Sequence, residues 1–316
     1  MKRTDSQVSE ARPGTPGNPI LVTNDMARIV NQAYSTIMPN KQIFGYPDQW
    51  EDFEKRNAKF IERFPTLKRA LDMAFVREFT TNTPADRAIY FLGRLCIEDF
   101  MELLCLAANG YGVGALKLLR GLYERVVTAA YLSKNPEEAD LFLDFRFISR
   151  HKALQAYIAG GTPDKRWLDL AEKKKDDFER VKARFEVDDC KKCGTKRTNH
   201  TWSKIDFVSM AKKTDLGKLL AQGYYEPLNH AHGTAEALML RLKLLPSEEI
   251  VFESGPQPGE ADRALMVAHA VMIELIGVQA EYFKMADIER AYEECAQDHV
   301  EIWSNRVIAI AVDPTA

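Results

Sequence analysis

The amino-acid sequence predicts an all-α protein, a multi-helix bundle, and three observations support this fold class. Glycine and proline divide the chain into segments of helical length. Strand signals are nearly absent, because the one run of β-branched residues, 307–312, lies at the carboxyl end. No internal repeat has the period of a solenoid. We therefore expect a helical bundle rather than a repeat array or a mixed fold.

Three regions are expected along the chain. Residues 1–20 are rich in Pro, Gly and Ser and predict a disordered tail. Residues 21–82 are expected to form an N-terminal helical appendage, and residues 83–312 an all-helical bundle domain. The helices expected within these regions are 25–37, 50–79 with a break at Pro65, 83–108, 114–132, 137–159, 162–186, 205–220, 223–245, 260–286 and a last one to 309.

The boundaries of these helices rest on residues that start or stop a helix. Thr83-Pro84-Ala85-Asp86 is a start signal, because proline is tolerated in a first turn and an acid there faces the helix dipole. Thr162-Pro163-Asp164 starts a later helix in the same way. The stop signals are Met38-Pro39, Asn109-Gly110, Asn135-Pro136, Gly160-Gly161 and the Pro/Gly/Ser-rich loop 246–259.

Composition places the chain among soluble globular proteins. Hydrophobic residues make up 46% and charged residues 28% of the chain, and the formal net charge is −3. No apolar run reaches the length of a membrane span, and the N-terminus lacks the apolar stretch of a secretory signal. Five cysteines are an odd number in a chain too long to need disulfides, so we expect a cytoplasmic protein with reduced thiols.

The segment 114–132 is expected to be the central helix, because apolar residues cover most of its circumference. Arg120 and Glu124 fall within one of its apolar stripes, four residues apart and therefore neighbours. A partly buried ion pair is costly to desolvate, so a reason other than stability is expected for it. The pair either ties two helices together or lines a polar functional pocket, and the sequence leaves both interpretations open.

A second cluster of polar residues follows Gly223. If 223–245 is one helix, His232 points inward and His230 outward. An inward histidine is often a structural core residue, but a neutral imidazole can also act as acid or base near neutral pH.

These two segments together resemble an uncharacterised prokaryotic all-helical family of unknown function. The residues that carry the resemblance are Gly110 to Glu124, Tyr131-Leu132, Asn135 to Glu138, Trp202-Ser203 and Tyr225-x2-Leu228-Asn229-x2-His232-Gly233. Members commonly have Ser where this chain has Asn229. We therefore take Arg120, Glu124, Tyr225, Asn229 and His232 as candidate catalytic residues. The helical layout is also similar to that of HEPN-type proteins, many of which cleave RNA in defence and toxin–antitoxin systems.

The HEPN resemblance implies an Arg followed by four to six residues and a His. Arg146 to His151 and Arg263 to His269 match this pattern, and Arg146 with His151 is the better candidate because its helix directly follows the Arg120 helix. In such a site His acts as general base and Arg stabilises the negative charge of the phosphorane, with no metal required.

Two features predict ligands of other kinds. Cys190-x2-Cys193-Gly194 has the form of half a structural zinc site, with His200 as the nearest third ligand, although a loop with two free thiols explains it equally well. Residues 165–218 contain 16 Lys/Arg against 10 Asp/Glu. This segment is either a solvated face or a basic arm that contacts RNA or a nucleotide.

The sequence thus supports two functional hypotheses. The first is a HEPN-like effector that acts on or responds to nucleic acid or nucleotides, as a metal-independent ribonuclease in prokaryotic defence or stress. The second is a non-enzymatic helical interaction module, in which Arg120–Glu124 is a structural bridge. Under either hypothesis we expect a homo-oligomer that does not contact membranes.

Overall fold

The prediction of an all-α bundle is confirmed by the computed structural model. It describes residues 45–79, 82–161, 164–190, 194–247 and 249–304, together with Leu21 and Val22. The α-helices are α2 (Asp48–Arg56), α3 (Ala58–Phe75), α4 (Pro84–Ala108), α5 (Gly112–Lys134), α6 (Ala139–Ala159), α7 (Lys165–Lys173), α8 (Lys175–Lys182), α9 (Phe207–Lys212), α10 (Glu226–Ala231), α11 (Ala235–Met239), α12 (Pro258–Phe283) and α13 (Ala286–Trp303).

Short elements connect these helices. The 3-10 turns are η1 (Pro136–Glu138), η2 (Ala183–Phe185) and η3 (Asp215–Leu219), and η4 (Ala221–Tyr225) is one π-helical turn. The strands β2 (Glu186–Cys190) and β3 (Thr195–Thr198) form an antiparallel pair. The strands β1 (Leu21–Val22), β5 (Ile250–Phe252) and β4 (Leu242–Leu244) form a second small sheet. Strands β2 and β3 consist mostly of charged or hydroxyl residues, so they lack the alternating apolar pattern by which a strand is predicted.

The chain divides into two compact units. One contains the residues up to Ile43 and Gly233–Gly255, and the other contains Phe44–His232 and Pro256–Ala316. The second unit holds every described α-helix except α11. The expected tail 1–20, the expected helix 25–37 and the β-branched run 307–312 lie outside the described residues.

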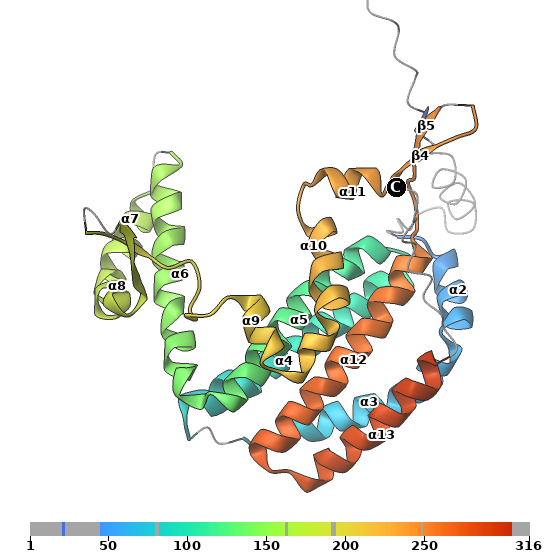
Figure 1. Ribbon diagram of the computed structural model, residues 1–316, viewed down its shortest axis with the longest axis horizontal. Helices are drawn as coiled ribbons and strands as arrows, with labels where there is room; N and C mark the ends of the chain where they lie inside the picture. The colour runs from blue at the N-terminus through green and yellow to red at the C-terminus, as the bar shows by residue number, and fades with distance from the viewer. Residues whose placement is uncertain are drawn as a thin grey trace, which may run out of the picture. The chain divides into compact units, whose positions relative to one another are not determined.

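Helix α5 lies in the middle of the second unit, packed against α4 and α12 (Figure 1). Leu116, Leu119, Leu122 and Val126 are completely buried on it, as the two apolar stripes of its sequence require. The helix therefore provides a rigid platform for the two charged residues, Arg120 and Glu124, that interrupt its apolar surface.

Helix α12 is also a core helix. Within the described part of the chain it is the one helix whose length and composition would allow it to cross a membrane, but 67% of its most apolar window is buried inside the protein. It contacts α4, α5, α13 and α3. Its apolar character is explained by packing on several sides.

Helices α2 and α3 fall in the region expected to be an appendage, and they contribute Phe53, Phe60 and Phe75 to the main core. The predicted break at Pro65 is wrong, since α3 runs through this exposed proline. The helix is interrupted instead at Asn57, whose Nδ2 donates to the Phe53 carbonyl at 3.1 Å and to Asp262 Oδ1 at 2.9 Å. These side-chain hydrogen bonds compensate for the backbone hydrogen bonds that are lost between α2 and α3.

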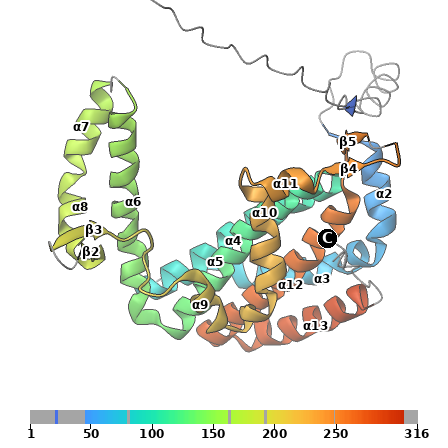
Figure 2. The same cartoon turned by 45° about the horizontal axis from the view of Figure 1, so that its top comes forward.

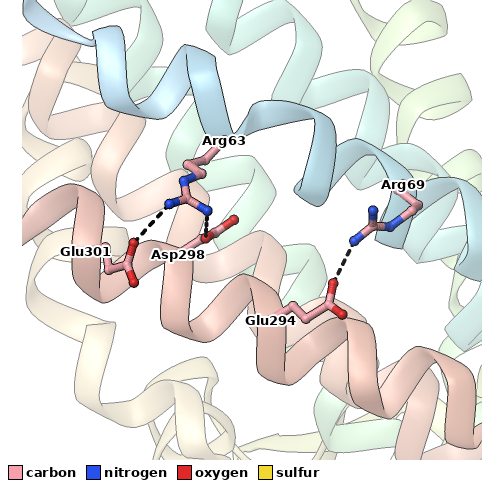
Figure 3. Close-up of polar contacts among 5 residues, drawn as sticks. All are labelled: Arg63, Arg69, Glu294, Asp298 and Glu301. Carbon is pink, nitrogen blue, oxygen red and sulfur yellow. Dashed lines mark hydrogen bonds and ion pairs between the residues drawn. The ribbon is translucent and has the colours of Figure 1, made fainter.

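Ion pairs join α3 to α13 along their exposed sides (Figure 3). Arg63 contacts Asp298 Oδ1 and Glu301 Oε2, each at 3.3 Å, and Arg69 contacts Glu294 Oε2 at 2.6 Å. Asp298 is buried, but the other side chains of these pairs are largely exposed. Exposed ion pairs add little to stability individually, so the apolar contacts beneath them carry most of the packing energy.

The predicted start of α4 is confirmed as a reciprocal capping box. The backbone N–H of Asp86 donates to Thr83 Oγ1 at 3.1 Å, and the backbone N–H of Thr83 donates to Asp86 Oδ2 at 3.0 Å. Burial alone would raise the pKa of Asp86, but hydrogen bonds from Thr83, Asn82 and Tyr282 outweigh it and lower the pKa.

Helices α6, α7 and α8 lie side by side and, with the β2–β3 pair, form a sub-structure with its own small core (Figures 1 and 2). That core consists of Ile148 from α6 with Phe178, Val181 and Phe185. We refer to residues 139–199 as the arm.

Candidate functional site

Arg120 and Glu124 form the expected pair on α5. Arg120 Nε donates to Glu124 Oε1 at 2.8 Å, and the side chains retain 20% and 39% of their exposure. Arg120 Nη1 lies 2.9 Å from His232 Nε2, so residues 112 positions apart meet here. The guanidinium also stacks over the ring of Tyr224, with Cζ 4.9 Å from the ring centroid. We call Arg120, Glu124, Tyr224 and His232 the Arg120 cluster.

The segment that brings His232 to Arg120 is not the pair of long helices expected. The predicted helices 205–220 and 223–245 are wrong, because α9, η3, η4, α10 and α11 follow one another as short pieces. Thr234 caps α11 by accepting from the Ala237 backbone N–H at 3.1 Å. A residue in this N-cap conformation is extended, which prevents α10 from continuing into α11.

The predicted orientation of the two histidines is also wrong. Helix α10 ends at Ala231, and His232 follows it in extended backbone, so no helical face determines where its side chain points. His232 is exposed to solvent while it contacts Arg120, and His230, expected outside, is half-buried. The contact between Arg120 and His232 therefore depends on where α10 stops.

Tyr224 is a member of the cluster that sequence periodicity did not identify. It lies in the π-helical turn η4 and packs against Phe207 at 4.8 Å and Tyr225 at 5.3 Å between ring centroids. The predicted Tyr225 is 48% exposed and contacts Tyr224 rather than Arg120. The family resemblance names Tyr225, while the π turn, which changes the rotation per residue, directs the neighbouring Tyr224 to Arg120.

The contacts of the cluster assign its hydrogen-bond donors and acceptors. An arginine can only donate, so His232 Nε2 accepts in its contact with Arg120 Nη1. Glu124 compensates the charge of Arg120 from the other edge. Within the residues that the structure describes, Nη2 of Arg120 has no hydrogen-bond partner, so one edge of the guanidinium remains available to an anion.

Arg146 and His151 are not part of this cluster. Arg146 is exposed and lies over the ring of Phe147, with Cζ 4.6 Å from the centroid. His151 stacks on Phe178 at 3.7 Å between centroids, and burial there lowers its pKa. Five residues apart on α6, the two side chains point to different sides of the helix.

The other match to the Arg–His pattern, Arg263 with His269, is occupied by contacts within the bundle. Arg263 pairs with Glu226 at 3.7 Å and with Glu260 at 3.5 Å. His269 is 2% exposed, and its Nδ1 accepts a hydrogen bond from Trp303 Nε1 at 3.1 Å. Asn229, the remaining predicted site residue, is half-buried on α10 and already has an interaction partner.

The zinc hypothesis for Cys190, Cys193 and His200 stays a prediction. Cys190 ends β2, Cys193 lies outside the described residues, and His200 is an exposed residue shortly after β3. Among the residues that the structure describes, no three His, Cys, Asp or Glu side chains are grouped in a way that could hold a metal ion.

We expect a thiol titration combined with metal analysis to separate the five cysteines. Burial raises the pKa of Cys96, and burial, followed by the charge of Asp298, raises that of Cys295 to about 12, so both should react only after unfolding. Exposed Cys105 should react in the native protein. If Cys190 and Cys193 hold zinc, both thiols should be protected until a chelator is added, and mass spectrometry should find zinc that is lost in Cys190→Ser; two free thiols should instead react directly and carry no metal. Equal metal content in both proteins would contradict the zinc site.

The fold and the cluster define a class, an all-α bundle domain with a charged Arg–Glu–His group beside its central helix. The chain belongs to DUF5677, a family of unknown function, whose model matches residues 86–250. The match includes α4 from Asp86 onward, α5, the arm and every residue of the Arg120 cluster, so the resemblance to an uncharacterised helical family is confirmed. Neither the curated proteins nor the solved structures give a significant match.

Proposed function

We propose that this protein is a cytoplasmic, HEPN-like helical effector of prokaryotic defence or stress that cleaves RNA without a metal ion at the Arg120 cluster. One observation carries the proposal: the 2.9 Å contact between Arg120 Nη1 and His232 Nε2. An arginine beside an imidazole supplies a positive charge and a general base, which together support cleavage of a phosphodiester by an internal hydroxyl.

The proposed chemistry follows from the hydrogen bonds. A phosphate that binds the free edge of Arg120 competes for Nη1 and releases His232 Nε2 to act as general base. His232 removes the proton from a ribose 2′-hydroxyl, whose oxygen attacks phosphorus. The bond to the 5′-oxygen breaks, that oxygen takes a proton from water, and the products are a 2′,3′-cyclic phosphate and a free 5′-hydroxyl. Arg120 stabilises the charge that develops on the phosphate oxygens.

The contacts of Arg120 support a role in positioning charge. Glu124 fixes the Nε edge and Tyr224 supports one face, so the guanidinium loses little entropy when it binds an anion. Arg146 and His151, the other residues predicted for this chemistry, contact different groups, so we assign them no role in the bond-breaking step.

The test is an RNA cleavage and growth-toxicity assay on wild type, His232→Ala, Arg120→Ala and Arg120→Lys. We expect His232→Ala and Arg120→Ala to lower the cleavage rate by about 10²- to 10³-fold, and Arg120→Lys to recover little, because lysine cannot bind Glu124 and an anion along two edges. His230→Ala, a replacement on α10, is the matched control and should retain activity. Equal rates for all proteins would contradict the proposal.

A second candidate function is favoured by the same contacts. Arg120 joins α5 to the segment 221–232 through His232 and Tyr224, as a bridge would in a non-enzymatic interaction module that forms a homodimer. On that hypothesis Arg120→Ala lowers the free energy of unfolding or changes the oligomeric state, measured by light scattering, and none of the proteins cleaves RNA.

A further inference from the structure

Two exposed aromatic rings stack on each other where α6 meets α7. Tyr157 and Trp167 lie 4.7 Å apart between centroids with an interplanar angle of 9°, and they are 61% and 38% exposed. Neither belongs to a core cluster of the described residues. A parallel, solvent-exposed pair of this kind offers a flat apolar surface on which another ring can stack.

A stripe of arginines leads along α6 to this pair. Arg146, Arg150 and Tyr157 lie at intervals of four and seven residues, which places them on one face of the helix over roughly 16 Å. Within the described part of the chain neither arginine has a carboxylate partner. Arg146 shares the ring of Phe147 with Arg180, whose Cζ lies 5.1 Å from its centroid, so positive charge is concentrated here.

Several other cations of the arm pair with acids close to them in the sequence. Lys174 pairs with Asp177, Lys182 with Glu179 and Arg166 with Asp164. These ion pairs compensate part of the basic character predicted for 165–218. The unpaired arginines of α6 are the stronger attraction for a polyanion.

The stripe begins at a groove between α4 and α6. The groove has a volume of about 420 Å³, and Arg87, Phe91 and Arg146 lie along it. Phe91 is 53% exposed. Two acids also line the groove, Asp140 and Asp144, and Asp144 is neutralised by its ion pair with Arg184. The groove therefore adds an exposed aromatic ring and a further arginine at this end of the stripe.

We propose that this face of α6, from the groove to the Tyr157–Trp167 pair, binds single-stranded RNA. Phosphates contact Arg87, Arg146 and Arg150, and bases stack on Phe91 and on the exposed aromatic pair. Stacking on a side chain requires bases that are not already paired and stacked in a duplex, so a single strand is the substrate class that fits. This inference rests on the proposed function, since it names the RNA that the Arg120 cluster would receive.

The test measures binding separately from cleavage. Fluorescence anisotropy with a labelled single-stranded RNA is recorded for full-length His232→Ala protein, in which cleavage is expected to be suppressed. Adding Trp167→Ala should weaken binding by about 5- to 100-fold. Adding Arg146→Ala with Arg150→Ala should weaken binding and reduce the slope of log affinity against log salt by about 1.4. Trp50→Ala and Arg69→Ala, an exposed aromatic ring and an exposed arginine outside the stripe, are matched controls that should bind normally.

Each outcome decides the proposal. Unchanged affinity in the stripe variants, with RNA still bound, would overturn the stripe while the cleavage proposal stands on its own assay. Equal affinity for duplex and single strand would overturn the assignment to single strands.

Absence of any RNA binding would overturn the inference. Weakened binding in the stripe variants, without cleavage by wild-type protein, would support the stripe and refute the proposed function. The replaced side chains are exposed, so circular dichroism should show unchanged folding.

Discussion

Gly223→Ala is expected to lower the free energy of unfolding by about 1–3 kcal/mol and to reduce RNA cleavage, although it removes no reactive group. A Cβ atom at position 223 would lie 2.7 Å from Cδ2 and 2.9 Å from Cγ of Tyr123. Tyr123 cannot easily move away, since it is completely buried and its hydroxyl donates to the Leu216 carbonyl at 2.8 Å. The backbone of η4 must therefore shift instead.

The shift would reach the Arg120 cluster through the chain. Tyr224 follows Gly223 directly, and α10 with His232 follows Tyr224, so moving η4 away from α5 moves both groups relative to Arg120. A displacement of about 1 Å at a catalytic contact can reduce a rate by about 10²-fold. Chemical denaturation and the RNA cleavage assay measure the two effects on the same protein.

Gly121→Ala is the matched control for this experiment. Gly121 lies on α5 beside Arg120, and among the described residues a Cβ atom added there would approach only the flexible Arg125 Nη1, at 3.3 Å. Alanine is favoured over glycine in a helix by up to about 1 kcal/mol, so this variant should be equally or more stable, with normal activity. If Gly223→Ala is as stable and active as Gly121→Ala, the close packing of η4 on Tyr123 does not position the cluster.

The sequence predicted those elements whose signals are local. Thr83, Pro84 and Asp86 identify the start of α4 because a capping box involves only four neighbouring residues. The apolar stripes of α5 identify the central helix, and the spacing of Arg120 and Glu124 identifies their ion pair, because both depend on one helical period. Each of these predictions needed no knowledge of the rest of the chain.

The parts of the site that the sequence did not predict depend on tertiary contacts. The π turn at η4 selects Tyr224 instead of Tyr225, and it is packed closely against Tyr123 from a different helix. The family resemblance named His232 and Arg120 together as candidate site residues, while helical periodicity placed His232 inside a helix that ends before it. Arg146 and His151 match a pattern in sequence, but the packing of α8 on α6 engages His151 elsewhere. The pattern and spacing of residues in the sequence do not show which of several possible tertiary contacts a side chain makes.

Acid is expected to destabilise the protein through His269. This histidine lies on α12 in the core and does not belong to the Arg120 cluster. Burial, and secondarily the neighbouring His299, lowers the pKa of His269 to about 3 from an ordinary value of 6.5. The unfolded chain therefore binds a proton near pH 6.5 that the folded chain does not bind until about pH 3. Between these values the unfolded state is favoured as pH falls, by about 1.4 kcal/mol per pH unit for this one group.

The variant His269→Gln isolates this contribution, because glutamine can still accept the hydrogen bond from Trp303 Nε1 but does not titrate. At pH 7.5 we expect wild type to be the more stable protein by about 1–3 kcal/mol, since the imidazole packs against Phe60 at 5.3 Å and His299 at 5.1 Å between centroids. At pH 5 the difference in unfolding free energy between the two proteins should be smaller by about 2 kcal/mol. Only wild type has a side chain at position 269 that binds a proton in the unfolded state and not in the folded state. Urea unfolding of both proteins at several pH values measures this, and parallel stability curves would show that His269 is protonated equally in the folded and unfolded states.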